Sequence, residues 1–336
     1  MKVVVTGGAG FIGCNLAITL AKRGDEVILG DNLSRPGSDR NLEAMLADEE
    51  IASRITFHEM DVRDADACMA LLADGADGVA HLAAQVSVTD SLEDPFADFD
   101  INARGTLNVL EATRKLAPEA RLLFTSTNKV YGGLSDLPVE KTDTRYVLPT
   151  LAEGVSESRP TTAATPYGCS KLAGDLYVHD YAKTFGMNTT VFRMSCIYGT
   201  HQNGNVDQGW VSWMVRAAIE GKDLTIYGDG LQVRDLLHVD DLVRAFLMVL
   251  TTDAGRGEVF NIGGGPDFSL SVWGEFGKVL EEQLGRPVPV AYDDWRPSDQ
   301  YVYISDLSKV SKALDWAPVK SPEEGIAEVV SWVHAT

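Results

Sequence analysis

Three glycines close to the start of the chain constrain the fold more than any other feature. Residues 2–6 read Lys-Val-Val-Val-Thr, a β-branched run, and Gly7, Gly10 and Gly13 follow as an apolar pattern of helical spacing begins. The predicted order is strand, glycine turn, helix. Unpaired N–H groups at the helix start would hold a pyrophosphate without any basic side chain. Gly7 would make the turn, Gly10 would allow close approach and Gly13 would let the helix pack on the strand.

An acidic residue after the next predicted strand extends this pattern. Residues 26–30 read Glu-Val-Ile-Leu-Gly and end at Asp31. A dinucleotide-binding fold places an acid about 20 residues past the glycines, where it binds the adenosine ribose diol. The alternative is an ordinary glycine turn followed by a solvated acid. Asp31 would repel a 2′-phosphate and so favours NAD over NADP, although Arg35 is close enough in sequence to weaken that preference.

Charge and cysteine content exclude several classes of partner. The 336 residues carry a formal net charge of −20, which disfavours nucleic acid and an anionic membrane surface. The four cysteines form no C-x-x-C pair, which indicates a reducing compartment and no metal site; they are Cys14, Cys68, Cys169 and Cys196. The apolar stretch at the N-terminus is only as long as a strand, and no run approaches about 18 apolar residues. We therefore expect a cytoplasmic protein.

Predicted strands alternate with predicted helices along most of the chain. After the first two, strands are expected at 55–58, 78–84, 121–127, 189–193 and 259–262. Helices are expected from residue 42, over 95–112, 167–185 and 209–219, up to 250, and over about 270–284 and 323–334. Residues 134–165 are predicted to form a long loop, a lid or a substrate rim. This rhythm predicts a Rossmann-type α/β fold, a doubly wound parallel sheet with ligands at the carboxyl ends of its strands.

Two domains are expected on this basis. Residues 1–194 are predicted to form a dinucleotide-binding domain, to which the segment 234–263 returns. Residues 195–336 are predicted to form a smaller, interleaved substrate lobe. At the end of the third strand, Asp61 is a candidate contact to the adenine amino group; the alternative is a helix N-cap for the segment that starts at Asp64. His81, within a strand, is interpreted as a core histidine with its hydrogen bonds satisfied.

A tyrosine and a lysine four residues apart could perform proton chemistry. Tyr167 and Lys171 would lie on one face of a helix, where an ammonium can sit near a phenol. A nearby cation and a positive nicotinamide ring would both favour the phenolate. Thr127, at the end of its strand, could share the hydrogen bond to a reacting alcohol.

These motifs together resemble the extended short-chain dehydrogenase/reductase family over nearly the whole chain. The match includes the glycine loop, Asn102 with Gly105-Thr106, Thr127, Tyr167-x-x-x-Lys171 and Arg234-Asp235. Members act mostly on nucleotide-sugars. Several segments, among them Ser126–Gly132 and Asp207–Val211, are more similar to the branch that inverts C2 of a CDP-hexose than to the 4-epimerases.

The resemblance implies specific roles. Tyr167 would be the base and acid, Lys171 its electrostatic partner and Thr127 the third hydroxyl. Implied NAD contacts are Gly7, Gly10, Phe11, Ile12, Gly13, Asp31, Asn32, Asp61, Val62, Leu82, Ala83, Ala84, Asn102, Tyr167 and Lys171. Implied substrate contacts are Gln85, Asn128, Gln208, Arg234 and Arg296, with the two arginines as candidates for a diphosphate. A homodimer or homotetramer, associated through helices around Leu107 and Tyr177, is implied as well.

Two departures from the family pattern refine the expected reaction. Dehydratases carry an Asp-Glu pair after the threonine, whereas this chain has Asn128-Lys129, which disfavours dehydration. Many relatives have Arg-x-x-Asn in a later strand, whereas this chain has Arg193-Met-Ser-Cys196. The usual contact between that asparagine and the sugar-nucleotide is therefore left open. The expected reaction is epimerisation by transient oxidation. The alternatives are a 4-epimerase, a net dehydrogenase, reductase or decarboxylase, and a non-catalytic NAD-sensing protein.

Overall fold

Two compact units make up the structure, a computed structural model that describes residues 1–296 and 299–336. The first unit comprises Met1–Val130, Thr165–Arg193 and Val243–Phe260; the second comprises Tyr131–Ala164, Met194–Leu242 and Asn261–Thr336. The predicted division of labour between a cofactor domain and a substrate lobe stays a prediction. By contacts, residues 131–164 group with the second unit although their sequence position lies before the predicted boundary.

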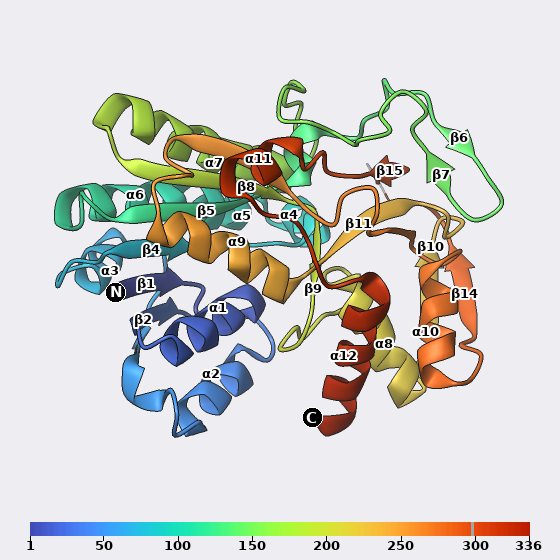
Figure 1. Ribbon diagram of the computed structural model, residues 1–336, viewed down its shortest axis with the longest axis horizontal. Coiled ribbons are helices and arrows are strands. Elements are labelled where there is room, and N and C mark those ends of the chain that lie inside the picture. Colours follow the sequence, from blue (N-terminus) through green and yellow to red (C-terminus); the bar gives the residue numbers. More distant parts are fainter. Residues whose placement is uncertain (297–298) are drawn as a thin grey trace. The chain divides into compact units, whose positions relative to one another are not determined.

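The first unit is built on a seven-stranded sheet of order β12-β8-β5-β4-β1-β2-β3 (Figure 1). Its strands are β1 (Lys2–Thr6), β2 (Glu26–Asp31), β3 (Ile55–Glu59), β4 (Gly78–His81), β5 (Arg121–Thr127), β8 (Asn188–Met194) and β12 (Glu258–Ile262). The pairs β1–β2, β2–β3, β1–β4 and β4–β5 are parallel. The strand order reverses between β1 and β4, so the prediction of a doubly wound sheet is confirmed.

Helices cover this sheet. They are α1 (Phe11–Lys22), α2 (Ser38–Ala47), η1 (Ala52–Arg54), α3 (Ala65–Leu71), α4 (Val88–Glu93), α5 (Pro95–Phe99), the π-helical η2 (Asp100–Arg104), α6 (Gly105–Leu116), η3 (Asn128–Tyr131), α7 (Pro166–Phe185) and α9 (Val239–Thr251). Figure 1 shows α6 and α7 on one side of the sheet and α1 and α9 on the other. Strand residues such as Val79 and Phe124 pack with Val109 of α6 and Val178 of α7 in a closed apolar core.

Three predicted boundaries of the first unit differ from the structure. Helix α2 begins at Ser38 rather than at Leu42, because Gly37, with φ of 87°, makes the turn immediately before it. Strand β4 ends at His81, so the predicted strand residues 82–84 form the loop that follows. The long helix predicted from Pro95 is interrupted by the π-helical η2.

The second unit consists of short strands and four helices within the described part of the chain. The strands are β6 (Glu140–Lys141), β7 (Tyr146–Val147), β9 (Cys196–Tyr198), β10 (Leu224–Tyr227), β11 (Val233–His238), β13 (Ser269–Ser271), β14 (Val290–Asp293) and β15 (Val302–Tyr303). The helices are α8 (Trp210–Glu220), α10 (Phe276–Leu284), α11 (Ser308–Leu314) and α12 (Pro322–Ala335). Its core includes Val215, Leu280 and Val329 from α8, α10 and α12.

Two predictions for the second unit need correction. The loop predicted over 134–165 contains the antiparallel pair of β6 and β7. The helix predicted from Leu270 begins at Phe276, because Leu270 belongs to β13 and pairs with Arg234 of β11. Across the described residues, every helix is too short or too polar to span a membrane.

Candidate active site

The glycine loop joins β1 to α1 as predicted. Gly7 has a φ of 70°, and a Cβ there would lie 2.6 Å from the backbone nitrogen of Ala83. A Cβ at Gly13 would collide with the carbonyl oxygen of Gly7. The N-cap residue of α1 is Gly10, and within the described chain neither a side-chain cap nor an acidic residue occupies the first turn. The first N–H groups of α1 therefore remain available to an anion.

Asp31 lies at the carboxyl end of β2, beside this loop. Its two oxygens accept hydrogen bonds from the backbone N–H groups of Ala9, at 3.0 Å, and Leu33, at 2.8 Å. Burial raises the pKa of Asp31, and these backbone donors oppose the shift. A buried carboxylate is stabilised by further hydrogen-bond donors, which the two hydroxyls of a ribose would supply.

Asp61, after β3, is held by neighbouring side chains. Arg63 donates to it at 2.9 and 2.8 Å, and Asn32 donates at 2.9 Å. The hydrogen bond from Arg63 is the main cause that lowers the pKa of Asp61 to about 2. The alternative role as a helix N-cap is wrong, because Asp64 itself caps α3 by accepting from the N–H of Asp66. An adenine contact by Asp61 stays a prediction.

Residues after β4 reach the same edge of the sheet, because parallel strands end together. Leu82, Ala83, Ala84 and Gln85 are half-buried, and the Oε1 atom of Gln85 is buried without a hydrogen-bond partner among the described residues. The backbone of Gln85 is fixed by Asn102, whose amide accepts from its N–H and donates to its C=O, both at 3.0 Å. Asn102 is completely buried, so the structure shows it as a clamp for this loop; its predicted cofactor contact stays a prediction.

His81, at the end of β4, confirms the prediction of a satisfied core histidine. Its Nδ1 lies 2.7 Å from the Thr6 hydroxyl and its Nε2 lies 3.0 Å from the Thr106 hydroxyl. The Thr106 hydroxyl donates its own proton to the carbonyl of Asn102, so it can only accept from His81. Nε2 of His81 is therefore the donor, and Nδ1 accepts from the Thr6 hydroxyl. Burial lowers the pKa of His81 to about 3, which keeps the ring neutral at physiological pH.

The predicted chemical group assembles in the first unit. Thr127 ends β5, and Tyr167 and Lys171 lie one turn apart near the start of α7, whose N-cap is Thr165. Tyr167 is 9% exposed and shares a hydrogen bond with the Thr127 hydroxyl. The Lys171 ammonium is 3% exposed and lies 4.4 Å from the centre of the Phe124 ring. The hydrogen bond between Thr127 and Tyr167 joins two of the predicted residues, and the catalytic roles of all three stay a prediction.

Burial controls the proton affinities of this group. It raises the pKa of Tyr167 to about 12, and the hydrogen bond from Thr127 opposes this shift. It lowers the pKa of Lys171 to about 7, against the charges of Asp175 and Asp98. In the free protein the cost of burying each charge is the largest influence on both pKa values, and the predicted effect of the ammonium on the phenol stays a prediction. A positive nicotinamide ring remains as the second predicted factor.

The comparisons with known proteins agree with this geometry. The sequence model of the NAD dependent epimerase/dehydratase family matches residues 3–263. The chain belongs to this family. The CDP-paratose 2-epimerase of Salmonella typhi is 39% identical to it over 342 residues, covering 100% of both chains.

Solved structures of the family have the same fold. The UDP-glucose 4-epimerase of Thermotoga maritima, solved with UDP-glucose, matches with a TM-score of 0.82 and 30% identity over 100% of this chain and 99% of that chain. The UDP-glucuronic acid 4-epimerase of Bacillus cereus, in complex with UDP-glucuronic acid and NAD, matches with a TM-score of 0.83 and 29% identity over the same shares. NAD is the cofactor of this family, and the uncapped helix start and the buried Asp31 fit it.

The family's candidate substrate residues in the second unit are held by acidic side chains. Arg234, 9% exposed, donates to Asp299 at 2.6 Å. The Arg296 guanidinium lies 3.3 Å from Asp207 and 4.1 Å from the centre of the Tyr227 ring. Gln208, also a candidate substrate contact, pairs its backbone with Asn205. The candidate Asn128 belongs to the first unit, where it begins η3 and accepts from Thr127 at 3.3 Å. A substrate diphosphate would have to compete with Asp299 and Asp207.

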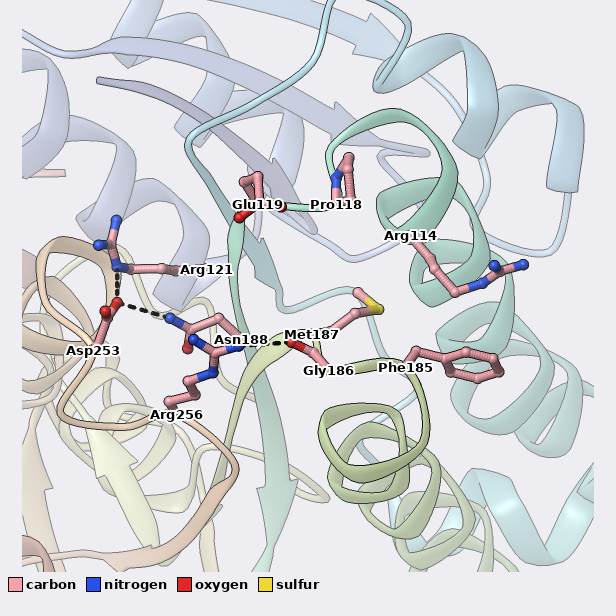
Figure 2. Close-up of a pocket in the computed structure, with 10 residues that line it drawn as sticks. All are labelled: Arg114, Pro118, Glu119, Arg121, Phe185, Gly186, Met187, Asn188, Asp253 and Arg256. Atoms are coloured by element: carbon pink, nitrogen blue, oxygen red, sulfur yellow. Dashed lines mark hydrogen bonds and ion pairs between the residues drawn. The ribbon is translucent and has the colours of Figure 1, made fainter.

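A hollow in the first unit lies at the amino ends of the strands, opposite the ends that carry the predicted site residues. It has a volume of about 400 Å³ and its lining includes Arg121 and Asn188, which begin β5 and β8 (Figure 2). Asp253 accepts from both at 3.0 Å, and Arg256 donates to the carbonyl of Gly186 at 2.9 Å. Its positive charges are thus engaged within the protein, and the hollow contains none of the predicted site residues.

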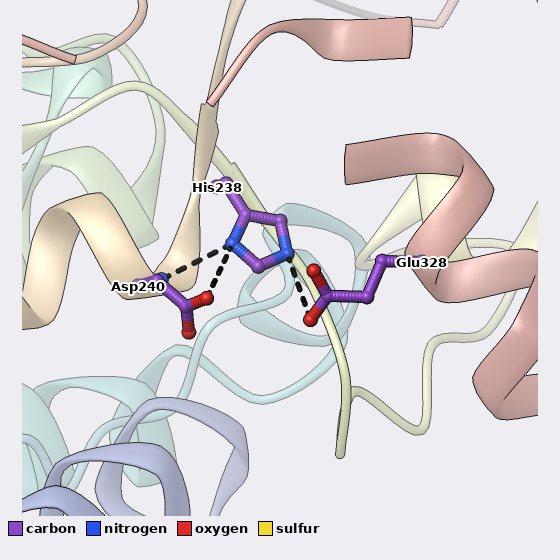
Figure 3. A group of neighbouring side chains, drawn as sticks. All are labelled: His238, Asp240 and Glu328. Carbon is purple, nitrogen blue, oxygen red and sulfur yellow. Dashed lines mark hydrogen bonds and ion pairs between the residues drawn. The ribbon is translucent and has the colours of Figure 1, made fainter. Parts of the chain in front are cut away.

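One cluster in the second unit has the composition of a metal site. His238, Asp240 and Glu328 lie together, with Nδ1 of His238 3.5 Å from Asp240 and Nε2 3.8 Å from Glu328 (Figure 3). The Lys320 ammonium donates to both carboxylates, at 2.6 and 2.5 Å. An internal cation therefore already pairs with both acids.

Proposed function

We propose that this enzyme is an NAD-dependent nucleotide-sugar epimerase that inverts C2 of a CDP-hexose by transient oxidation. The hydrogen bond between Thr127 and Tyr167, and Lys171 over the Phe124 ring of the strand that ends in Thr127, support the redox part of this proposal. Asn128-Lys129 in place of an acidic pair supports epimerisation over dehydration. The similarity to CDP-paratose 2-epimerase over the full length of both chains supports the choice of C2 and of CDP.

The residues of the chain would act as follows. Tyr167, with its proton relay through the Thr127 hydroxyl, takes the proton of one ring hydroxyl as the C–O bond becomes a carbonyl. NAD, when bound, supplies the acceptor and then the donor of the hydride from the same carbon. The planar keto-sugar turns over, and Tyr167 returns the proton to the oxygen after the opposite face has been reduced. Lys171 stabilises the phenolate during both steps.

This detour is required by the chemistry of the sugar. A carbinol C–H is not acidic enough to be removed as a proton, so an unactivated carbon is inverted by oxidation followed by reduction. Because the hydride is returned to the same sugar in each cycle, NAD is regenerated and stays bound.

Proton NMR in D2O tests the proposal directly. The purified enzyme is incubated separately with CDP-, GDP- and UDP-hexoses, and each ring proton of the sugar is followed. We expect inversion at C2 of the CDP-hexose with the original C–H hydrogen retained. Deuterium at the inverted carbon would contradict the redox mechanism, and inversion at C4 would assign the enzyme to the 4-epimerases, which are also similar to this chain at 31% and 30% identity.

Absorbance at 340 nm separates the remaining alternatives. A net dehydrogenase or decarboxylase would release NADH in proportion to substrate, and a non-catalytic NAD-sensing protein would change neither the sugar nor the absorbance. The proposed epimerase changes the sugar without accumulating NADH.

We further propose that two copies associate through α4, α5 and α7. These helices contact one another, and they expose large apolar side chains; these are Leu92, Phe96, Phe99, Leu176 and Tyr177, with Phe96 84% exposed. Leu107, around which the sequence predicted association, instead packs against the core of its own unit. Contiguous exposed apolar surface of this kind is typical of a protein interface.

A further inference from the structure

Asp98, on α5 of the first unit, is a buried acid to which no role has been given above. It is 1% exposed. Its Oδ1 accepts from the Asn102 amide at 3.1 Å, and Ser170 also hydrogen-bonds to the carboxyl. Its Oδ2 is buried and has no hydrogen-bond partner among the described residues. Burial raises the pKa of Asp98, whereas the hydrogen bond with Ser170, the positive charge of Lys171 and the hydrogen bond with Asn102 oppose this shift and favour the carboxylate.

The nearest helix that carries such a charge is α7. The Asn102 amide links Asp98 to Ser170, whose hydroxyl lies 3.1 Å from the amide nitrogen and also 3.1 Å from the carbonyl oxygen of Tyr167. Ser170 is the residue before Lys171. A single side chain, the Asn102 amide, therefore connects Asp98 to the segment that carries Tyr167 and Lys171. The negative charge of Asp98 raises the pKa of both residues.

A second carboxylate, that of Asp175, also raises the pKa of Lys171, and its effect is the larger of the two. Asp175, one turn later on α7, is paired with Arg193 of β8 at 2.8 and 2.9 Å. His81 of β4 is neutral, and β5 contributes the uncharged Phe124 ring. Asp98 of α5 is the facing carboxylate whose charge is not offset by a guanidinium in the described structure.

We propose that Asp98 is a positioning residue that keeps the buried Lys171 ammonium charged at neutral pH. It acts through Lys171 and has no contact with the reacting atoms. This inference rests on the proposed function in one respect: the charge on Lys171 serves to stabilise the Tyr167 phenolate. Burial brings the pKa of Lys171 down to about 7, so a small change in its surroundings changes its charge at neutral pH.

Titration of Lys171 in the free protein tests this proposal without any sugar. Lysines are labelled with ¹³C at Cε, the Lys171 signal is assigned by its loss in Lys171→Arg, and its shift is followed against pH. In Asp98→Asn we expect the midpoint to fall by about one unit or more, the effect of removing a neighbouring opposite charge. Asp98→Glu, which restores the charge, should titrate close to the unchanged protein.

Asp100→Asn is the matched control. Asp100 lies two residues further along, is half-buried and pairs with Arg104 at 2.9 Å. The same chemical change there should leave the Lys171 midpoint where it is. A midpoint in Asp98→Asn that stays within about 0.3 units of the unchanged protein, or rises, would overturn the proposal. If Asp98→Asn fails to fold, Asp98→Ser provides the same comparison.

The pH profile of turnover provides a second readout. Activity should decline as pH rises through the Lys171 midpoint, and in Asp98→Asn this decline should move to lower pH by the same shift. A purely structural role would lower activity at every pH without moving the profile. If the unchanged protein acts on no nucleotide-sugar, the proposed function fails while the titration still decides the role of Asp98.

Discussion

At the scale of single residues, burial disfavours the charged forms of both Tyr167 and Lys171. The pKa of the phenol is raised to about 12 and that of the ammonium is lowered to about 7. A phenol in this state gives up its proton only when a positive charge is close by. The proposed roles of Asp98 and Lys171 follow from this requirement for a positive charge.

Replacing the phenol should abolish turnover without affecting the fold. We expect Tyr167→Phe to bind NAD and to lose epimerisation by at least about 100-fold, the size of a general acid–base contribution. NMR of the sugar measures turnover, and absorbance after denaturation measures bound NAD. Tyr177→Phe, which removes an exposed hydroxyl from the same helix, should keep full activity. Near-normal activity in Tyr167→Phe would refute its assignment as the base.

The charge of Asp31 should determine the preference for NAD. Asp31→Asn keeps an oxygen for the backbone donors of the loop but no longer repels a 2′-phosphate. We expect the affinity for NADP relative to NAD to rise by about tenfold or more, equivalent to about 1.4 kcal/mol. Calorimetric titration of both nucleotides measures it, with the exposed Asp39→Asn as control. Unchanged selectivity would exclude a ribose contact by Asp31.

The sequence predicted some members of the site better than others, for physical reasons. Tyr167 and Lys171 stand at helical spacing, so one sequence rule places them together. Asp98 was missed because its partner Lys171 is distant in sequence. The available signal was its position four residues before Asn102, which puts both on one helix face.

At the scale of elements, α7 approaches the sheet, α6 and η2 closely at one position. A Cβ at Gly174 would lie 2.9 Å from the Phe124 ring and 3.2 Å from the Thr106 hydroxyl. The glycine thus allows the helix that carries Tyr167 to pack tightly on β5.

Gly174→Ala should test this contact. We expect it to lower the free energy of unfolding by about 1 to 3 kcal/mol, because packed side chains must move. Urea denaturation followed by circular dichroism measures the change. Gly133→Ala, where a Cβ would meet no described atom within 4 Å, should be close to neutral. Equal stability of the two variants would show that α7 adjusts without cost.

Elements of the first unit could be predicted because central strands such as β1 and β4 are short buried runs, mostly apolar, between turn signals. Most strands of the second unit were missed, among them β9, β10 and β14. They have only three or four residues and pair with distant segments, so local sequence carries little information about them. The starts of α2 and α10 were misplaced for a related reason, since a turn and a strand pairing decide them.

At the scale of the whole molecule, the exposed apolar side chains predict a dimer. Phe96→Asp places a charge in the middle of the proposed interface and should convert the protein to a monomer, which light scattering coupled to size exclusion detects. Phe185→Asp, an equally apolar position at the end of α7 with 49% exposure, is the control and should leave the assembly intact. A monomeric unchanged protein would refute the proposed dimer.

The interleaving of the two units also determines the order in which the protein can form as it leaves the ribosome. Residues 1–130 contain only β3, β2, β1, β4 and β5, so β5 remains an open edge of the emerging sheet until β8 has been synthesised. The outermost strand, β12, follows only after residue 258. An unpaired apolar edge invites association with other chains. Synthesis that stalls between β5 and β8 should therefore leave the nascent chain in its most aggregation-prone form.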